Sequence, residues 1–362
     1  MRIAILGSRG IPASYGGFET FADVLSRQLV KRGYSVDVFC EKRPKIQPTI
    51  YDGVHLRYTN SPNLRSLTTI WYDIKCLFKS LFSKYDIVYM LGYGSSIFCF
   101  FPRLSGSKVW INMDGLEWKR EKWNKIGKTY LKIMEYIATK TADLLVADSN
   151  GIKDYLINKY DDVPIEMISY GSEIINQCSS NKIKLYELEK YKYYLVVCRL
   201  EPENYVQEII EGFIKSHSHN KLVIVGNHII NTKYVRNLLK YDSNRVKFLG
   251  TIYDQSKLRE LRYHCFAYIH GHSVGGTNPS LLEAMAAGNR IIAQDNIFNR
   301  EVGQDAIQYF SCNDDLSNII NTMETDYQHN REYSKNTQNI IRKRYNWDVI
   351  LSQYEELIKN SV

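Results

Sequence analysis

The chain has 362 residues, of which 44% are hydrophobic and 24% are charged, and its formal net charge is +8. This length favours two globular domains over one, and the composition is that of a soluble globular protein rather than a disordered one. The seven cysteines are scattered without a metal-ligand spacing or a paired framework, so we expect reduced thiols in a cytoplasmic protein.

The apolar segments are all short. The first ten residues, MRIAILGSRG, hold a four-residue apolar run that fits a buried strand better than a signal peptide, and SSIFCFF (95–101) falls well short of the roughly 20 residues of a spanning helix. We therefore expect a protein that is neither secreted nor integral to a membrane. The positive charge fits either a solvated basic surface or attraction to diphosphates or an anionic membrane face. Because no basic run or nucleic-acid motif accompanies it, we expect no nucleic-acid partner.

The first half of the chain alternates between strand and helix patterns. In the helix expected to follow the first strand, Phe18, Phe21, Ala22, Leu25 and Leu29 share one face, and Gly33 is placed to end it. The expected strands are 2–7, 35–40, 86–91, 107–113, 143–149 and 165–171, and the expected helices are 18–33, 68–83, 124–141 and 150–159.

The alternation stops in the polar segment 172–190 and then begins again. The expected strands are 193–200, 221–226, 246–250, 265–271 and 290–295, and the expected helices are 204–216, 232–241, 254–262 and 279–287. This order is typical of parallel sheets covered on both faces, so the predicted fold class is α/β with two Rossmann-like domains. We expect an N-terminal domain at 1–175 and a C-terminal domain at 176–345. The amphipathic segment 346–362 either crosses back to the first domain or caps the second.

Ligands of parallel sheets bind beyond the carboxyl ends of the strands, so the loops there are the candidate sites. Gly16 and Gly17 lie where a helix begins and can bring amide N–H groups close to a phosphate, although a turn that simply needs glycine explains them too. Arg199 follows a strand and can bind a diphosphate with two hydrogen bonds. The alternative for Arg199 is an ordinary salt bridge to Glu201 or Glu203.

The third loop is HGHSVGGTNPSLLEAMAAG (270–288). Asn278 suits an N-cap and Pro279 the first helical position, so a helix with its positive end toward the loop is predicted. Gly275, Gly276 and Thr277 would let the loop approach an anionic ligand closely, and Glu283, one turn into the helix, could accept hydrogen bonds from sugar hydroxyls.

Three stretches together resemble a known family. GSRGIPASYGGFETF (7–21), NMDGLEWKREKW (112–123) and HGHSVGGTNPSLLEAMA (270–286) are similar to the retaining GT-B glycosyltransferases of family four. More narrowly, they resemble the bacterial rhamnosyltransferase-type subgroup first described as a domain of unknown function. The resemblance implies two Rossmann-like domains facing across a cleft, with a C-terminal helix that crosses back. It also implies that Arg199 and Glu283 hold the diphosphate and the ribose.

The chain departs from the family pattern at three places. Gly275 stands where the first carboxylate of a Glu-(seven residues)-Glu pair is expected, Asn204 replaces a lysine, and the pair Asp114-Gly115 replaces a histidine. We infer that His270 and His272 could take over contacts to the donor sugar. His270 could equally be a core residue at the end of a strand.

The resemblance implies retention of anomeric configuration, with a departing diphosphate oxygen that helps to remove the acceptor proton. Arg199, Asp114 and Glu283 are then the candidate catalytic residues. No Asp-x-Asp triplet is present, so neither a metal nor another cofactor is expected besides the nucleotide-sugar co-substrate. The segment after Met113 could orient the acceptor hydroxyl and hold its phosphates, or merely cap the next helix. The candidate acceptor residues are Asp114, Glu117, Trp118 and Arg120.

By resemblance, the acceptor is a polyprenyl-diphosphate-linked saccharide in surface polysaccharide synthesis, and dTDP-L-rhamnose is the first donor hypothesis. One local pattern agrees, because DIKCLFKSLFSKY (73–85) places apolar residues on one stripe with lysines around it. Such a helix could rest on the inner face of the cytoplasmic membrane, or simply face the core. The alternative functions are a nucleotide-sugar epimerase of the same architecture and a non-catalytic sugar-binding protein.

Overall fold

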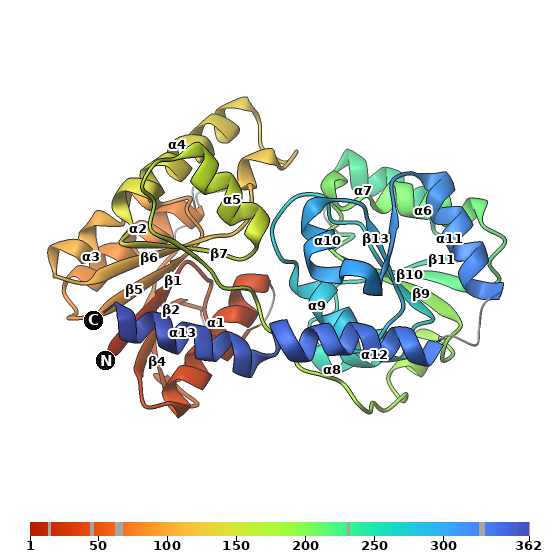
Figure 1. Ribbon diagram of the computed structural model, residues 1–362, viewed down its shortest axis with the longest axis horizontal. Coiled ribbons are helices and arrows are strands. Elements are labelled where there is room, and N and C mark those ends of the chain that lie inside the picture. The colour runs from red at the N-terminus through yellow and green to blue at the C-terminus, as the bar shows by residue number, and fades with distance from the viewer. Residues whose placement is uncertain (14–15, 44–46, 62–67, 230–231, 326–329, 362) are drawn as a thin grey trace. The chain divides into compact units, whose positions relative to one another are not determined.

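The computed structural model describes residues 1–362 except 14–15, 44–46, 62–67, 230–231, 326–329 and 362. Two compact units are present (Figure 1). Unit 1 comprises Met1–Lys119, Trp123–Ser169 and Ile350–Val362, and unit 2 comprises Arg120–Lys122 and Tyr170–Val349. Across the described residues, every helix is too short or too polar to cross a bilayer.

Unit 1 is built on a sheet of eight strands in the order β3-β4-β2-β1-β5-β6-β7-β8, in which only the β3–β4 pair is antiparallel. The central strands are buried except at the first residues of β1 and β6, as their apolar runs require in a sheet covered on both faces. The strands are β1 (Arg2–Leu6), β2 (Ser35–Glu41), β3 (Ile50–Tyr51), β4 (Val54–Thr59), β5 (Ile87–Leu91), β6 (Lys108–Met113), β7 (Leu144–Ala147) and β8 (Ile165–Met167).

The helices of unit 1 lie on both faces of this sheet (Figure 1). They are α1 (Gly17–Lys31), α2 (Thr68–Leu81), α3 (Phe100–Leu104), α4 (Lys125–Thr141) and α5 (Asn150–Lys159), with short 3-10 helices η2 (Ser96–Phe98) and η3 (Glu117–Lys119). Phe21, Ala22, Leu25 and Leu29 face the core from α1, as their spacing predicts. The sequence pattern did not reveal β3, β4 or α3.

The C-terminal helix α13 (Trp347–Asn360) completes the core of unit 1. The Tyr354 hydroxyl lies 3.0 Å from the Tyr89 hydroxyl on β5, and the Tyr354 ring lies 6.0 Å from that of Phe21 on α1. Arg32 and Glu355 form an ion pair of 3.0 Å at the edge of this contact. The last residues of the chain therefore pack against its first elements, as a helix that crosses back would.

Unit 2 contains a six-stranded, all-parallel sheet in the order β11-β10-β9-β12-β13-β14. Together with the sheet of unit 1, it confirms the predicted α/β class with two Rossmann-like sheets. The strands of this second sheet are β9 (Tyr193–Val197), β10 (Lys221–Val225), β11 (Val246–Gly250), β12 (Ala267–His270), β13 (Ile291–Gln294) and β14 (Gln308–Phe310).

Helices α6, α7 and α11 of unit 2 contribute apolar residues to the core that the sheet forms. On α6, for example, Val206, Ile209, Ile210 and Phe213 join the same apolar core as the strands. The longer helices are α6 (Val206–Lys215), α7 (Lys233–Leu238), α8 (Gln255–His264), α9 (Pro279–Ala286), α10 (Ile297–Gly303), α11 (Asn313–Thr325) and α12 (Asn330–Ile340), and a π-helix follows at Ile341–Tyr345. The 3-10 helices are η4 (Ile183–Tyr186), η5 (Pro202–Asn204), η6 (Leu239–Tyr241) and η7 (Gln304–Ala306).

Each sheet reverses its strand order once, and this point defines where a ligand is expected. The reversal lies between β1 and β5 in unit 1 and between β9 and β12 in unit 2. The connections leave adjacent strands there in opposite directions, which opens a crevice at the carboxyl ends of the strands. In unit 2 the loops concerned begin at Cys198 and Gly271.

Candidate functional site

The candidate site of unit 2 is built from the loops that follow β9 and β12. Arg199 is the second residue after β9, and its side chain is 45% exposed. Its Nε lies 3.7 Å from Glu201 Oε2, so the salt bridge anticipated from the sequence is present but long. An exposed guanidinium with one distant partner keeps most of its donors available to an anion.

Asn204, which replaces the family's lysine, has a local structural role. Its side chain is buried, and its Nδ2 donates a hydrogen bond of 2.7 Å to the Arg199 carbonyl oxygen. The same loop is closed by a bond from the Asn204 N–H to the Glu201 carbonyl. Asn204 therefore fixes the backbone that presents Arg199.

The two loops are joined to one another. Ser273 donates to the Glu203 carbonyl oxygen twice, from its N–H at 3.0 Å and from its hydroxyl at 2.9 Å. At Gly271 the approach is so close that a Cβ would lie 2.1 Å from the Asn204 carbonyl oxygen, so only glycine fits. Arg199 and the loop before α9 are thus held in one rigid arrangement.

Helix α9 begins as the sequence predicts. The Asn278 side chain accepts a hydrogen bond of 3.0 Å from the Ser280 N–H, and Pro279 is the first helical residue. The Ser280 hydroxyl in turn bonds to the Val197 carbonyl at 3.2 Å and lies 2.8 Å from the Tyr268 hydroxyl, which ties α9 to β9 and β12. The positive end of α9 is therefore fixed at the point where the strand order reverses.

Gly275, in the loop before this helix, has φ of +127°, and a Cβ built there would meet nothing within 4 Å. The position where the family carries a carboxylate thus faces open space and has a backbone that suits glycine. Gly276 follows it, and Thr277 is buried directly before the cap.

Glu283 has a partner that the sequence analysis missed. Its Oε2 lies 2.5 Å from Nη2 of Arg262, a buried residue of α8, and the Glu283 side chain itself is partly exposed. This ion pair fixes one carboxylate oxygen and leaves the exposed part of the group to a ligand. The sequence could have indicated a buried partner, because Arg262 lies on the face of α8 that the apolar Leu258 and Leu261 form.

His270 and His272 stack in parallel behind the loop, with ring centroids 4.4 Å apart. His270 is 1% exposed at the end of β12, and neither of its ring nitrogens has a hydrogen-bond partner among the described residues. Burial lowers the pKa of His270 to about 3 and also lowers that of His272. Both rings are therefore neutral at physiological pH.

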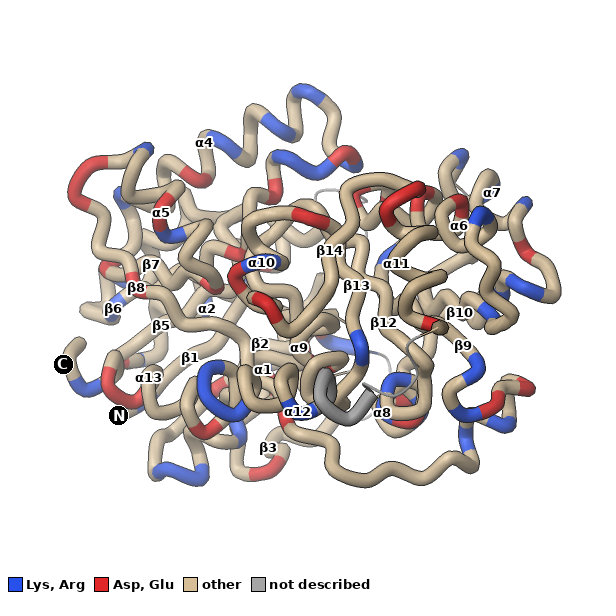
Figure 2. The backbone as a smooth tube through the Cα atoms, turned by 45° about the vertical axis from the view of Figure 1, so that its right-hand side comes forward, with Lys and Arg blue, Asp and Glu red and all other residues tan. Residues whose placement is uncertain are grey.

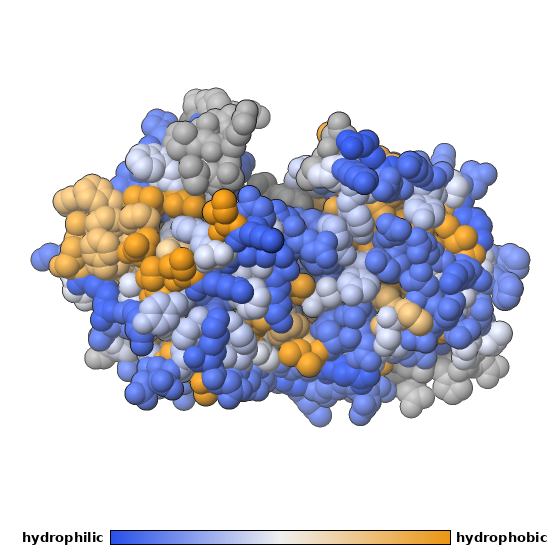
Figure 3. All heavy atoms as spheres, turned by 90° about the horizontal axis from the view of Figure 1, so that it is seen from above, coloured by the Kyte–Doolittle hydropathy of each residue, from blue (hydrophilic) through white to orange (hydrophobic). Residues whose placement is uncertain are grey.

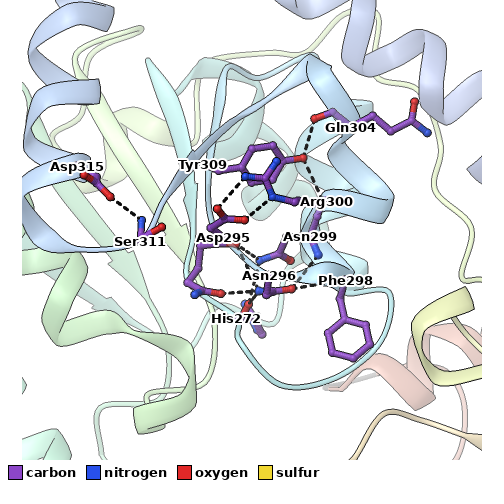
Figure 4. Close-up of polar contacts among 11 residues, drawn as sticks. His272, Asp295, Asn296, Phe298, Asn299, Arg300, Gln304, Tyr309, Ser311 and Asp315 are labelled. Carbon is purple, nitrogen blue, oxygen red and sulfur yellow. Dashed lines mark hydrogen bonds and ion pairs between the residues drawn. The ribbon is translucent and has the colours of Figure 1, made fainter. Parts of the chain in front are cut away.

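The backbone of His272 is held by two asparagines after β13. Asn296 and Asn299 each donate a side-chain hydrogen bond of 3.0 Å to the His272 carbonyl oxygen (Figure 4). Asn296 also caps α10 by accepting from the N–H groups of Phe298 and Asn299. Of the two histidines, His272 is the less buried one and belongs to the loop itself.

The sequence also predicted a phosphate contact at Gly16 and Gly17 in unit 1. Gly16 is the N-cap of α1 and Gly17 its first residue, while Ser14 and Tyr15 of the same loop lie outside the described residues. The Glu19 carboxylate occupies this helix end and accepts a bond of 2.9 Å from the Arg9 N–H. A negative charge at this position opposes an anion, so the phosphate contact stays a prediction that the local charge does not favour.

Two of the predicted acceptor residues lie together after β6. Asp114 directly follows the strand, and the Glu117 N–H donates 3.0 Å to the Tyr93 hydroxyl after β5. Glu117 Oε1 accepts a hydrogen bond of 3.1 Å from the Trp123 indole N–H. These two residues are thus at the carboxyl edge of the sheet in unit 1, close to its reversal of strand order.

Trp118 is held in place by side chains of α4. Its indole N–H donates 2.9 Å to Oε2 of buried Glu135, and the Lys132 ammonium lies 4.5 Å from its ring centroid. The other Glu135 oxygen accepts bonds from Lys159 and from the hydroxyls of two tyrosines, Tyr155 and Tyr160. These contacts anchor η3 to α4 and α5, so the structure gives Trp118 a packing role and its contact with an acceptor stays a prediction.

Arg120 belongs to unit 2 by its contacts, unlike the other predicted acceptor residues. Its Nη1 lies 3.6 Å from Glu201 Oε2, the atom that also faces Arg199. Burial, with the neighbouring Glu201 carboxylate as a further cause, raises the pKa of Glu203. Within unit 2 the structure therefore brings together Arg199, Arg120 and the loop before α9.

The described residues offer no cluster of three or more His, Cys, Asp or Glu side chains that could hold a metal. The loops after β9 and β12 of unit 2 offer a guanidinium and the N-terminal end of a helix, groups that suit an anion. The expectation that no metal takes part stays a prediction.

Two family models match the two halves of the chain. Residues 179–340 match the family model described as "Glycosyl transferases group 1", and residues 1–173 match one described as a domain of unknown function. Residues 179–340 are therefore similar to a group 1 glycosyltransferase domain. In this domain are Arg199, the loop before α9, Glu283 and both stacked histidines.

The curated relative of this chain is distant in sequence. A curated protein of Methanocaldococcus jannaschii, described as an uncharacterized glycosyltransferase, is 26% identical over 253 residues, which is 66% of this chain and 64% of the relative. The match thus spans somewhat less than two thirds of that relative.

Solved structures share the fold over the full length. A sucrose-phosphate synthase of Thermosynechococcus elongatus is similar with a TM-score of 0.83 at 17% identity, covering 99% of this chain and 98% of the other. The Anabaena protein HepE, solved with UDP and glucose, has a TM-score of 0.79 at 18% identity, covering 99% and 100%. These likenesses show that the chain has the GT-B fold. They do not bear on the rhamnosyltransferase subgroup that the sequence suggested.

Proposed function

We propose that the chain is a retaining glycosyltransferase that moves a sugar from a nucleotide diphosphate to a polyprenyl-diphosphate-linked saccharide. One observation carries the proposal. The loop that presents Arg199 is hydrogen-bonded to the loop before α9, so a cation and a helix N-terminus are fixed beside one another in a domain of the group 1 family.

The donor would lie across this arrangement. The diphosphate would accept hydrogen bonds from the Arg199 guanidinium and from N–H groups of the loop 275–277, and the partly exposed Glu283 carboxylate would hold the ribose. Arg262 keeps that carboxylate in one position. His272, neutral and fixed through its carbonyl, would supply a ring nitrogen to the donor sugar, in the place of the carboxylate that is absent at Gly275.

Catalysis would then depend on stabilising charge on the departing diphosphate. As the bond between the sugar and the phosphate breaks, negative charge grows on the oxygen nearest Arg199, and fixed donors stabilise it without reorganisation. The same oxygen would take the proton of the acceptor hydroxyl on the same face of the sugar, which retains the configuration. Asp114 and Glu117 would orient that hydroxyl, and no metal would be needed.

The proposal also covers which nucleotide and which sugar the donor carries. The resemblance of the sequence favours dTDP-L-rhamnose, whose nucleoside lacks a 2′-hydroxyl and would offer Glu283 only the 3′-hydroxyl. Structural neighbours were solved with UDP and glucose or with UDP-2-fluoro glucose, which makes uridine donors the necessary comparison.

The test is to incubate the purified protein with dTDP-L-rhamnose, UDP-glucose and UDP-N-acetylglucosamine, each with and without a lipid-diphosphate-linked glucose or N-acetylglucosamine. Release of nucleoside diphosphate that depends on the acceptor, with an α-linked product from an α-configured donor, is the expected result. A chelator should leave the rate unchanged.

Two outcomes would contradict the proposal. Conversion of the nucleotide-sugar in the absence of any acceptor would make the protein an epimerase. Tight binding of a donor with no turnover on any acceptor would make it a sugar-binding protein. Gly275 and the buried Asn204, which replace a carboxylate and a lysine of the family pattern, are the observations that favour this alternative.

A further inference from the structure

Unit 1 exposes an unusual number of large apolar side chains on α2, η2 and α3. We call this surface the aromatic face; its exposed members include Phe82, which is 74% exposed, and Leu104, which is 70% exposed. In Figure 3 it is the continuous apolar area at the left, the side on which α3 lies in Figure 1. The aromatic face consists of Phe78, Phe82, Ile97, Phe100, Phe101 and Leu104.

The rings of the aromatic face touch one another and form one surface. The Phe78 ring centroid lies 5.2 Å from that of Phe82 and 5.6 Å from that of Phe101, and Phe101 lies 4.4 Å from Phe100. Leu104 is four residues after Phe100 on α3 and therefore shares its side of the helix. A connected apolar patch of this kind on a soluble protein usually marks a docking surface.

The chain segment that carries the aromatic face is rich in basic residues. Between residues 68 and 108 the sequence has five of them, Lys75, Lys79, Lys84, Arg103 and Lys108, against two acidic residues. Of the acidic residues, Asp73 is buried, and only Asp86 is exposed.

Helix α4 extends this surface with the same composition. Ile126 and Ile133 are exposed on it, and four lysines lie along it (Figure 2), whereas its one acidic residue, Glu135, is buried. It is joined to the loop around η2 by hydrogen bonds from the Tyr130 hydroxyl to the Gly94 carbonyl and from the Thr141 hydroxyl to the Ser96 carbonyl.

We propose that the aromatic face docks on an anionic phospholipid bilayer, a partner that extends the proposed function because its acceptor is held in a membrane. Phenylalanine and leucine side chains at this exposure can enter the boundary between headgroups and acyl chains, while lysines at the rim meet the lipid phosphates. A second copy of the chain fits less well, because an isologous contact would place these basic rims against each other.

The test uses the purified full chain and needs no turnover, so it can fail or succeed independently of the proposed enzyme activity. Binding to phosphatidylcholine vesicles is compared with binding to vesicles that also contain about 30% phosphatidylglycerol, by sedimentation at low and at high salt. The double variant Phe82→Ser/Leu104→Ser should lower the partition coefficient at least about tenfold, and Lys84→Gln about fivefold at low salt.

Leu185→Ser is the matched control, because Leu185 is 68% exposed but lies on η4 in unit 2. It should bind vesicles as the wild type does, and circular dichroism should show that the variants remain folded. Equal binding of wild type and the double variant, or no preference for the anionic vesicles, would overturn the proposal. A wild-type dimer in the absence of lipid that the double variant abolishes would assign the aromatic face to a second copy instead.

Discussion

At the scale of single residues, Arg199 and His270 lie at neighbouring strand ends with opposite environments. The Arg199 guanidinium is exposed, with the Glu201 carboxylate 3.7 Å away, whereas the His270 ring is enclosed and neutral. The first can bind negative charge that develops in a reaction, and the second can supply shape, one N–H donor and one acceptor nitrogen. Each environment leads to a separate expectation.

Arg199→Ala should lower kcat/KM for the nucleotide-sugar by a factor that corresponds to about 2–4 kcal/mol of transition-state stabilisation, because a fixed donor to the departing diphosphate is lost. Initial rates with a saturating acceptor measure the change. Arg259→Ala, an exposed arginine on α8, is the control and should keep wild-type rates. Turnover of Arg199→Ala at the wild-type rate would show that the diphosphate binds elsewhere.

The buried His270 should make the protein less stable in acid. Its pKa is about 3 in the folded protein and about 6.5 in the unfolded chain, so between these values the unfolded state binds the extra proton and stability falls as the pH falls. Between pH 7.5 and 5.5 this group should cost about 1.4 kcal/mol of unfolding free energy.

Urea unfolding at the two pH values measures this loss in the wild type and in His270→Asn, which has no titrating ring. The loss should be smaller in that variant by the amount stated, and unchanged in the control His219→Gln, since His219 is exposed. An identical pH dependence in His270→Asn and wild type would contradict the assignment.

The candidate site could be predicted from the sequence only where local pattern encodes it. Asn278, Pro279 and Gly275 carry their geometry in their own backbone preferences, so the cap and the open loop could be expected. The partners of Glu283 and of the His272 carbonyl come from α8 and from the loop after β13. Such contacts depend on how distant elements meet, which no local spacing specifies.

At the scale of elements, strands and helices that bury a continuous apolar run or stripe were predictable, and the short edge elements were not. β3 and β4 form a small antiparallel addition with alternating burial, and α3 is five residues long. β3 and α3 have too few positions to show a period, whereas the apolar and polar residues of β4 alternate, a signal that the sequence analysis missed. Helix α9 could be predicted although it is short, because Asn278 and Pro279 together mark its first turn.

Asn278→Ala should cost about 0.5–2 kcal/mol of stability and also raise the KM for the nucleotide-sugar, because the loss of the cap loosens the helix end that faces the donor. Ser149→Ala removes an equivalent cap from α5 in unit 1, where the Ser149 hydroxyl accepts from the Ile152 N–H. It should cost similar stability with an unchanged KM. If both variants change the KM alike, the end of α9 has no special part in donor binding.

At the scale of the whole molecule, the chain returns to its first unit at its end. Tyr354 is fully buried on α13 against Phe21 and Tyr89, so the core of unit 1 includes a residue that the chain reaches only after unit 2. The stability of the first unit should therefore depend on the last helix.

Tyr354→Ala should lower the unfolding free energy by about 3–5 kcal/mol, as loss of a large buried ring does. Hydrogen exchange should locate the effect in peptides from α1 and β5, although the substitution lies more than 260 residues from β5 in the sequence. Gln353→Ala, its exposed neighbour, should have no measurable effect. Faster exchange confined to unit 2 would mean that α13 does not support the first sheet.

The placement of α13 also has a consequence for how the polypeptide is made. During translation the strands and helices of unit 1 emerge first, yet Phe21 and Tyr89 cannot be covered until residue 354 has left the ribosome. At about 5–20 residues per second, the unit made first must wait many seconds with part of its apolar core open. A chaperone would therefore be needed most while unit 1 has been synthesised and α13 has not.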